Sequence, residues 1–291
     1  MTDITIKDGY MYGGWKAPEN LYRAFDGQTS IHDDSVAKKV GMRGGTIPGT
    51  IHLSLFSPLM LELFGQRWFE KGSLSMYYTF ATTDKEKVRA VVKMPPEGVD
   101  DVQVEARVEM PSGQVVATGT VAVGEPKDLS YLHALELKNS NPEDLRILAG
   151  MKVGEELNPQ DILISQDDAN KGLPGITDNL DYYKGKSPWG NSILSPTAIY
   201  GTMALGSNTL KATEIKAVPF FGATEVRNIN GPVMVGIPYV ASGKIACAGA
   251  SSKTEYYWQD CLLKEKESGK EIASIRHMNR FMKAGSALYS K

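Results

Sequence analysis

The feature that most constrains the fold of this chain of 291 residues is a repeat at about half its length. The run Gly44-Gly-Thr-Ile47 resembles Gly190-Asn-Ser-Ile193, an offset of 146 between the two leading glycines. Further along, Ser112–Thr118 resembles Ser268–Ser274, an offset of 156. Two matches in the same order, both near half the chain length, predict a duplicated domain whose second copy carries extra residues between the two anchors.

The composition is that of an ordinary globular protein, with 42% hydrophobic and 23% charged residues and a formal net charge of −2. Acidic and basic residues are nearly equal in number, and the excess of Lys and Arg that is typical of nucleic-acid-binding proteins is not present. We therefore do not expect nucleic acid as a partner. A signal peptide and a long apolar span are not evident, and we expect a cytoplasmic protein with no membrane partner. The two cysteines, Cys247 and Cys261, are too few for a disulfide framework and are expected to be buried free thiols.

Each half is predicted to contain one main helix followed by strands. Apolar residues recur at helical spacing over Thr50–Phe64, and Pro58 within this run predicts a kink or short break. In the second half, Ser195 is a candidate N-cap and Pro196 suits the first helical position. The alternating, β-branched segments that predict strands are Ser73–Thr82, Lys87–Met94, Val102–Met110, Gln114–Val123, Ala223–Asn230, Tyr239–Ala246, Thr254–Leu263 and Glu271–Met282.

A long helix wrapped by an antiparallel sheet is the hot-dog arrangement, and two copies make a double hot dog. We therefore predict an α+β fold with a hot-dog domain at 1–125, a polar linker at 126–158 that is flanked and interrupted by prolines, and a second hot-dog domain at 159–291. The second copy has no histidine around its equivalent turn, Asp178–Gly190, and is expected to lack catalytic residues.

The segment before the first helix carries the most informative motif. Ile31-His32-x-Asp34, then Ala37, Gly41 and Gly49, resembles the motif of the MaoC-like family, which includes the (R)-specific enoyl-CoA hydratases. The resemblance implies an active site for acyl thioesters, with His32 as acid and base and Gly49 as an oxyanion donor at the start of the helix. It also implies a carboxylate partner for the histidine.

This sequence departs from the motif at three places. Gly27 stands where the family has its aspartate, five residues before His32, and the nearest carboxylate, Asp26, lies one position earlier. Pro48 stands at the position of the family's second histidine, and Thr29-Ser30 replaces its Asn-Pro pair. We assign Asp26 as the candidate partner of His32.

Four further residues are predicted to contact the substrate. Asp34 is the acid of the motif, although pairing with a helix start would also explain it. Arg43 could receive coenzyme A phosphates or belong to a solvated basic turn. Thr50 and His52 lie near the helix start. A histidine at such a position is more often a core or interface residue than a substrate contact, and this alternative stays open for His52. Elsewhere, His277 is flanked by Arg276 and followed by Arg280 on a predicted alternating strand, and we expect a solvated or inter-subunit position for it.

The resemblance favours a hydratase or dehydratase that adds water to, or removes it from, an acyl thioester carried by coenzyme A or a carrier protein. Two alternatives stay open: a hot-dog thioesterase, or a cyclase or lyase on a related substrate, and a binding protein that has lost its chemistry. The sequence has no cluster of potential ligands at the spacing of a metal site, and no Gly-x-Gly-x-x-Gly turn that opens a βαβ unit. We therefore expect no metal and no cofactor. A monomer or a homodimer is expected.

Overall fold

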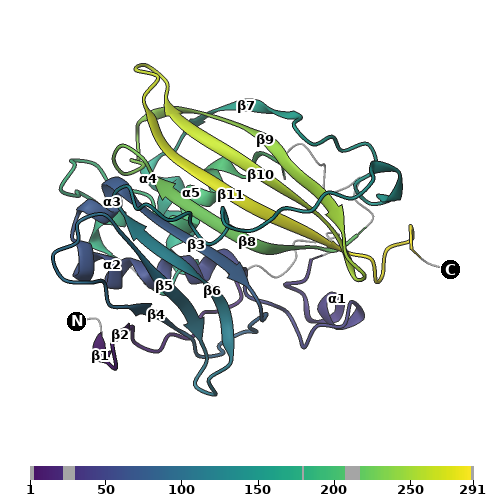
Figure 1. Cartoon of the computed structure of the whole chain (residues 1–291), viewed down its shortest axis with the longest axis horizontal. Coiled ribbons are helices and arrows are strands. Elements are labelled where there is room, and N and C mark those ends of the chain that lie inside the picture. Colours follow the sequence, from purple (N-terminus) through teal and green to yellow (C-terminus); the bar gives the residue numbers. More distant parts are fainter. Residues whose placement is uncertain (1–2, 22–29, 179, 207–216, 290–291) are drawn as a thin grey trace.

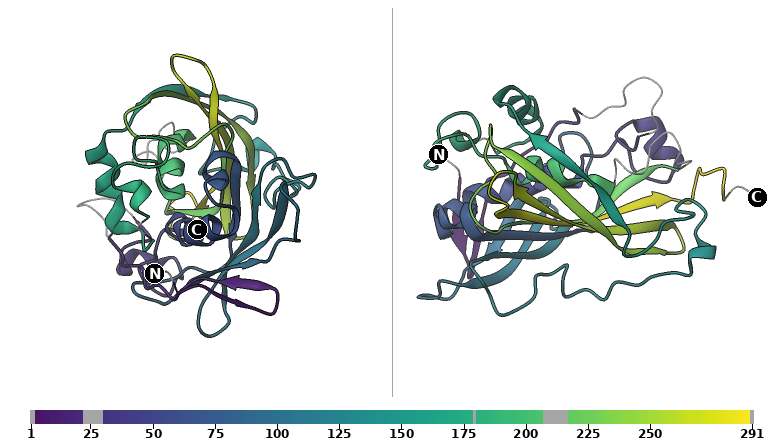
Figure 2. Two further views of the ribbon diagram at one scale, coloured as in Figure 1. Left: turned by 90° about the vertical axis from the view of Figure 1, so that its left-hand side faces the viewer. Right: turned by 90° about the horizontal axis from the view of Figure 1, so that it is seen from above.

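The computed structural model describes residues 3–21, 30–178, 180–206 and 217–289, and Figure 1 shows its arrangement. The strands of these residues form one antiparallel sheet of 11 strands, in the order β1-β2-β4-β5-β6-β3-β8-β11-β10-β9-β7. The sheet curves around the main helices, which lie on its concave side (Figure 2).

The sheet consists of two equivalent five-strand halves that meet where β3 pairs with β8. From the outer side of each half to this junction, the strands come in the same order: the first, third, fourth, fifth and second strand of that half along the chain. A duplicated hot dog requires this shared order. The first half contains β2 (Tyr10–Tyr12), β4 (Arg89–Lys93), β5 (Val102–Glu109), β6 (Val115–Val123) and β3 (Gly72–Tyr78). The second contains β7 (Glu156–Leu163), β9 (Pro238–Ala250), β10 (Thr254–Glu265), β11 (Glu271–Met282) and β8 (Pro219–Asn228), and β1 (Thr5–Lys7) extends the first half.

The main helix of the first half has two parts. A 3-10 segment, η1 (Gly49–Phe56), leads directly into α2 (Ser57–Phe64), so the predicted break falls at the start of the α-helical turns. Pro58 lies in the first turn of α2, where its missing N–H has no helical partner to lose.

The main helix of the second half, α5 (Pro196–Met203), packs against η1. The Thr197 hydroxyl donates a hydrogen bond of 2.7 Å to the Thr50 carbonyl and lies 2.8 Å from the Ser54 hydroxyl. The two helices are therefore joined by buried polar contacts as well as by apolar packing.

The strand predictions hold best in the core and worst at the edges. β11 has the predicted bounds, whereas β3 ends at Tyr78, four residues before the predicted Thr82. The sequence reading missed β1, β2 and β7, and β7 begins at Glu156, inside the segment predicted to be linker. It also left out α3 (Arg67–Lys71) and α4 (Gln166–Gly172), while α1 (Asp34–Lys39) starts at the motif's acid.

The connection between the halves runs along the outer face of the sheet (Figure 2). Its Leu132 is fully buried in a cluster with Trp258 and Met278. The Glu255 carboxylate accepts hydrogen bonds from three consecutive backbone N–H groups of this connection, those of residues 146–148. The connection is thus a packed structural element, held against the sheet by a buried leucine and by backbone hydrogen bonds.

The two cysteines are buried free thiols, as expected, and burial raises the pKa of Cys261 to about 12. Within the described ranges, none of the helices has both the length and the apolar character needed to cross a bilayer.

Candidate active site

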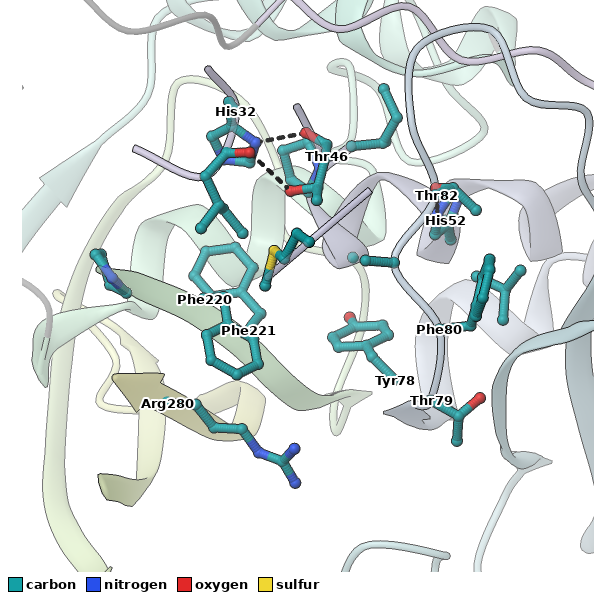
Figure 3. Close-up of a pocket in the computed structure, with 18 of the residues that line it drawn as sticks. His32, Thr46, His52, Tyr78, Thr79, Phe80, Thr82, Phe220, Phe221 and Arg280 are labelled. Carbon is teal, nitrogen blue, oxygen red and sulfur yellow. Dashed lines mark hydrogen bonds between the residues drawn. The ribbon is translucent and has the colours of Figure 1, made fainter. Parts of the chain in front are cut away.

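A cavity of about 280 Å³ lies at the start of η1, and we call it the N-terminal cavity. Figure 3 shows His32 and Thr46 on one side of it, Arg280 on the opposite side, and Tyr78, Phe220 and Phe221 between them. Both halves contribute, because Phe220 and Phe221 belong to β8 and Arg280 to β11. The lining also includes Ile31, Met42, Ile47, Pro48, Gly49, His52, Phe80 and Val116.

His32 is fixed on a loop that is hydrogen-bonded to the approach to η1. The backbone N–H of Thr46 donates to the carbonyl of Ile31 at 2.9 Å. Nδ1 of His32 lies 2.6 Å from the carbonyl oxygen of Thr46 (Figure 3). A carbonyl oxygen can only accept, so Nδ1 carries the proton. In the neutral ring the lone pair is therefore on Nε2.

Burial lowers the pKa of His32, and the hydrogen bond to Thr46 only partly offsets this effect. The neutral ring is favoured near neutral pH, because the ordinary pKa of histidine, about 6.5, is already below 7. His32 therefore has the protonation state that a general base requires.

The start of η1 offers backbone donors on the same cavity. The first N–H groups of a helix lack partners within the helix, and Pro48, which precedes η1, provides no side-chain hydrogen bond to them. Gly49 lies flat against the ring of Tyr78: a Cβ at this position would be 2.8 Å from two ring carbons. A larger residue there would clash with this ring. His32 and Gly49 both line the cavity, so the imidazole and the helix start share it.

Asp34 and Arg43 lie on a neighbouring surface pocket and not on the N-terminal cavity. The Asp34 carboxylate accepts a hydrogen bond of 2.6 Å from the N–H of Gly45, which shapes the turn before η1. Arg43 makes two hydrogen bonds to Glu86, at 2.7 and 2.8 Å, and this pairing raises its pKa. Both side chains are engaged in holding the loop.

Thr50 and His52 differ in their access to the cavity. Thr50 is buried and its carbonyl accepts from Thr197, so its contacts are with α5. His52 lines the cavity, with Nε2 3.0 Å from the Thr82 hydroxyl and Nδ1 without a hydrogen-bond partner. Burial lowers the pKa of His52 to about 4, so this ring is neutral at physiological pH.

Asp26, the candidate partner of His32, lies outside the described residues, and its role stays a prediction. Gly27, which stands at the motif position of the aspartate, also lies outside the described residues.

The expectation that His277 is solvated or at a subunit interface is wrong. Its side chain is fully buried, with Nδ1 2.8 Å from the Thr224 hydroxyl and Nε2 3.3 Å from the Tyr200 hydroxyl. Successive residues of a strand point to opposite faces, so the neighbouring Arg276 is no guide to the environment of His277. Burial lowers the pKa of His277 to about 3.

Sequence reasoning also missed two residues of the cavity wall, Tyr78 and Arg280. Tyr78 ends β3, and its hydroxyl has no hydrogen-bond partner. Arg280 reaches the cavity from the opposite half of the chain. Neither belongs to the motif around His32, and their strands, β3 and β11, come together because each pairs with β8. No cluster of three or more potential metal-ligating side chains occurs among the residues that the structure describes.

No protein-family model and no curated protein sequence matches the chain. Solved structures do resemble it. A protein of Chloroflexus aurantiacus J-10-fl, named as a MaoC domain protein dehydratase, superposes with a TM-score of 0.61 at 9% identity over 97% of this chain and 95% of its own. A conserved hypothetical protein of Mycobacterium tuberculosis, described as a double hot dog, gives 0.57 at 11% identity over 91% of this chain and 88% of its own.

The chain has the double hot-dog fold. This confirms the predicted α+β double hot dog, and it confirms the resemblance to MaoC-like dehydratases at the level of the fold. Identities of this size do not carry an activity from one double hot-dog protein to another, so the function has to be argued from the cavity itself.

Proposed function

We propose that this protein is a hydratase or dehydratase that adds water to an enoyl thioester, or removes it from a 3-hydroxyacyl thioester, in the N-terminal cavity. The observation that carries the proposal is the hydrogen bond from Nδ1 of His32 to the Thr46 carbonyl. In this tautomer the lone pair of the neutral imidazole is on Nε2, and His32 lines the cavity that also contains the uncapped start of η1.

The chemistry requires two complementary groups. As a water oxygen bonds to C3 of the enoyl group, the C2–C3 double bond opens and negative charge develops on the thioester oxygen. Backbone N–H groups at the start of η1 would stabilise that charge, since they are fixed in position and their helix start carries positive potential.

The proton balance closes on one residue. Nε2 of His32 takes a proton from the attacking water, and the imidazolium then returns it to C2, which yields the 3-hydroxyacyl thioester. Dehydration is the same sequence reversed. If Asp26 contacts His32, its carboxylate would stabilise the imidazolium during this exchange.

The lining supports an acyl substrate. Apolar side chains from both halves surround the cavity, and such a wall suits a hydrocarbon chain that extends from the thioester. The likeness to a protein of the same fold that is named as a dehydratase supports this proposal. The acyl group is carried by coenzyme A or by a carrier protein. Arg43, the residue predicted to receive coenzyme A phosphates, is paired with Glu86 and does not decide between these two carriers.

The decisive experiment measures hydration of crotonyl-CoA by the loss of its enone absorbance, for the unchanged protein and for His32→Ala. Loss of a general acid–base residue lowers turnover by roughly 10²- to 10⁴-fold, and we expect a loss in this range with an unchanged thermal unfolding curve. His133→Ala is the control for loss of a histidine outside the cavity, and its unfolding curve is measured as well because His133 pairs with the buried Glu225.

The same assay separates the alternatives. Release of free coenzyme A in place of 3-hydroxybutyryl-CoA would indicate a thioesterase. Full activity in His32→Ala would refute the proposed site, and tight binding of acyl thioesters with no turnover of any would indicate a binding protein.

A further inference from the structure

The C-terminal half repeats the hydrogen bonding that holds the loop of His32. In the first half, the N–H of Thr46 donates to the carbonyl of Ile31 at 2.9 Å. In the second half, the N–H of Ile193 donates to the carbonyl of Tyr182, also at 2.9 Å. The residue after Ile31 is His32, so the residue after Tyr182, Tyr183, occupies the equivalent position.

The next hydrogen bond of each half extends the equivalence. The N–H of Ile47 donates to the carbonyl of Thr82 at 2.8 Å, and the N–H of Leu194 donates to the carbonyl of Val233 at 2.8 Å. On this alignment Pro48 corresponds to Ser195. Each half therefore places one side chain capable of hydrogen bonding, His32 or Tyr183, beside the start of its main helix.

A cavity of about 200 Å³ lies at this second position, and we call it the C-terminal cavity. It opens beside the start of α5, and Tyr183 is part of its wall. This volume exceeds that of an engineered apolar cavity of roughly 150 Å³ known to hold benzene. The other lining residues are Ala169, Gly172, Leu173, Ile176, Ile193, Leu194, Ser195, Thr197 and Ala198.

Three buried polar atoms in or near this wall lack a hydrogen bond of ordinary geometry, and Tyr183 is the one of these residues that lines the cavity. They are the Tyr183 hydroxyl, the Ser57 hydroxyl of α2 and one carboxyl oxygen of Asp178. Tyr183 and Ser57 are at most 1% exposed and Asp178 is 6% exposed. A buried polar group is destabilising while it stays unpaired, so the Tyr183 hydroxyl favours a ligand that offers it a hydrogen-bond acceptor.

The electrostatics of the cluster favour an uncharged ligand. Burial raises the pKa of Asp178 to about 7, against the opposing charges of Lys16 and Lys184. Burial and the nearby Asp178 also raise the pKa of Tyr183, whose hydroxyl stays protonated, although the Ser57 hydroxyl acts in the opposite direction. The Tyr183 hydroxyl is thus neutral, and the nearby Asp178 carboxyl is partly protonated near neutral pH.

The start of α5 differs from the start of η1 in one respect that decides the chemistry. The Ser195 hydroxyl accepts a hydrogen bond of 3.2 Å from the N–H of Ala198, so this helix start is capped. An oxyanion would find one of its donors already engaged there. The C-terminal cavity is therefore suited to binding and not to the thioester chemistry proposed for His32.

We propose that the C-terminal cavity is a second ligand site, which takes a short uncharged aliphatic compound with a carbonyl or carboxamide oxygen. The Tyr183 hydroxyl donates to that oxygen, and the apolar wall surrounds the hydrocarbon part. The site is independent of the function proposed for the N-terminal cavity.

Methyl NMR with labelled isoleucine tests this proposal in the full chain, because each cavity contains two isoleucine reporters. Ile176 and Ile193 line the C-terminal cavity, whereas Ile31 and Ile47 line the N-terminal cavity. Butyramide is the probe. We expect saturable shifts of the Ile176 and Ile193 methyl signals and a dissociation constant about 5- to 10-fold weaker in Tyr183→Phe, the effect of one lost hydrogen bond.

Two comparisons keep the test decisive. His32→Ala should leave the butyramide affinity at Ile193 unchanged, whether or not the protein turns over thioesters. In the unchanged protein at pH 8, butyrate should bind at least about tenfold more weakly than butyramide, because burial disfavours a carboxylate and the nearby Asp178 is then mostly ionised. Absent shifts at Ile176 and Ile193, equal affinity in Tyr183→Phe, or equal affinity for butyrate would each overturn the proposal.

Discussion

The two cavities occupy equivalent positions in the two halves, yet they present opposite chemistry. The N-terminal cavity combines a neutral imidazole with a helix start that Pro48 leaves uncapped. The C-terminal cavity combines a phenol, Tyr183, with a helix start that Ser195 caps. The backbone hydrogen bonds around them are the same in pattern and nearly the same in length.

This difference shows which part of a hot-dog site the fold provides and which part single residues decide. The fold brings a loop residue to the beginning of a buried helix in both halves. Whether that helix start can stabilise developing charge depends on the residue before it, and whether a proton can move depends on the loop residue itself.

The largest effect should come from making the first helix start resemble the second. In Pro48→Ser, the new hydroxyl can accept a hydrogen bond from the first turn of η1, as Ser195 does in α5. Loss of one oxyanion donor costs about 10²- to 10³-fold in turnover, and partial competition should cost roughly 10- to 100-fold. Steady-state kinetics with crotonyl-CoA would show this loss in kcat, and unchanged kinetics would contradict the assignment of η1 as the oxyanion site.

Gly49→Ala should lower both stability and turnover. The new Cβ would lie 2.8 Å from the Tyr78 ring, and such overpacking costs roughly 1–3 kcal/mol. Urea unfolding measures the loss of stability. The double variant Gly49→Ala/Tyr78→Leu should recover part of it, and no recovery would show that the ring contact is not the cause.

Ser195→Ala should affect stability alone. Removing an N-cap typically costs about 1 kcal/mol, and the urea midpoint should fall accordingly. Turnover of crotonyl-CoA should stay within about twofold of the unchanged protein, because the C-terminal cavity has no part in the proposed reaction. A large loss of turnover would mean that the two cavities are coupled.

The sequence predicted the duplication because the repeated motifs are short, local and bound to glycine turns. It predicted β11 with its exact bounds, and this strand pairs on both sides within the sheet. β7 escaped notice because an edge strand that is largely exposed and contains Pro159 has no apolar pattern to reveal it. Edge strands tolerate such residues because one side of their backbone stays unpaired.

Residues of the site were predictable only where a motif surrounds them. His32 and Gly49 lie within one such stretch, and the structure places both on the N-terminal cavity. Tyr183 could not be found by a fixed offset, which pairs His32 with Asp178. Fifteen positions separate Ile31 from Thr46, but eleven separate Tyr182 from Ile193, and only the hydrogen bonds reveal which residues correspond.

The central claim is that Nε2 of a neutral His32 accepts the proton, and ¹⁵N NMR of the histidine ring measures this directly. The signal of His32, assigned by its loss in His32→Gln, should report the tautomer protonated at Nδ1, with a pKa below the ordinary value of about 6.5. Because the neutral ring is the active form, kcat/KM should fall as the pH drops through that same pKa. A ring protonated at Nε2, or a pKa above 6.5, would contradict the account.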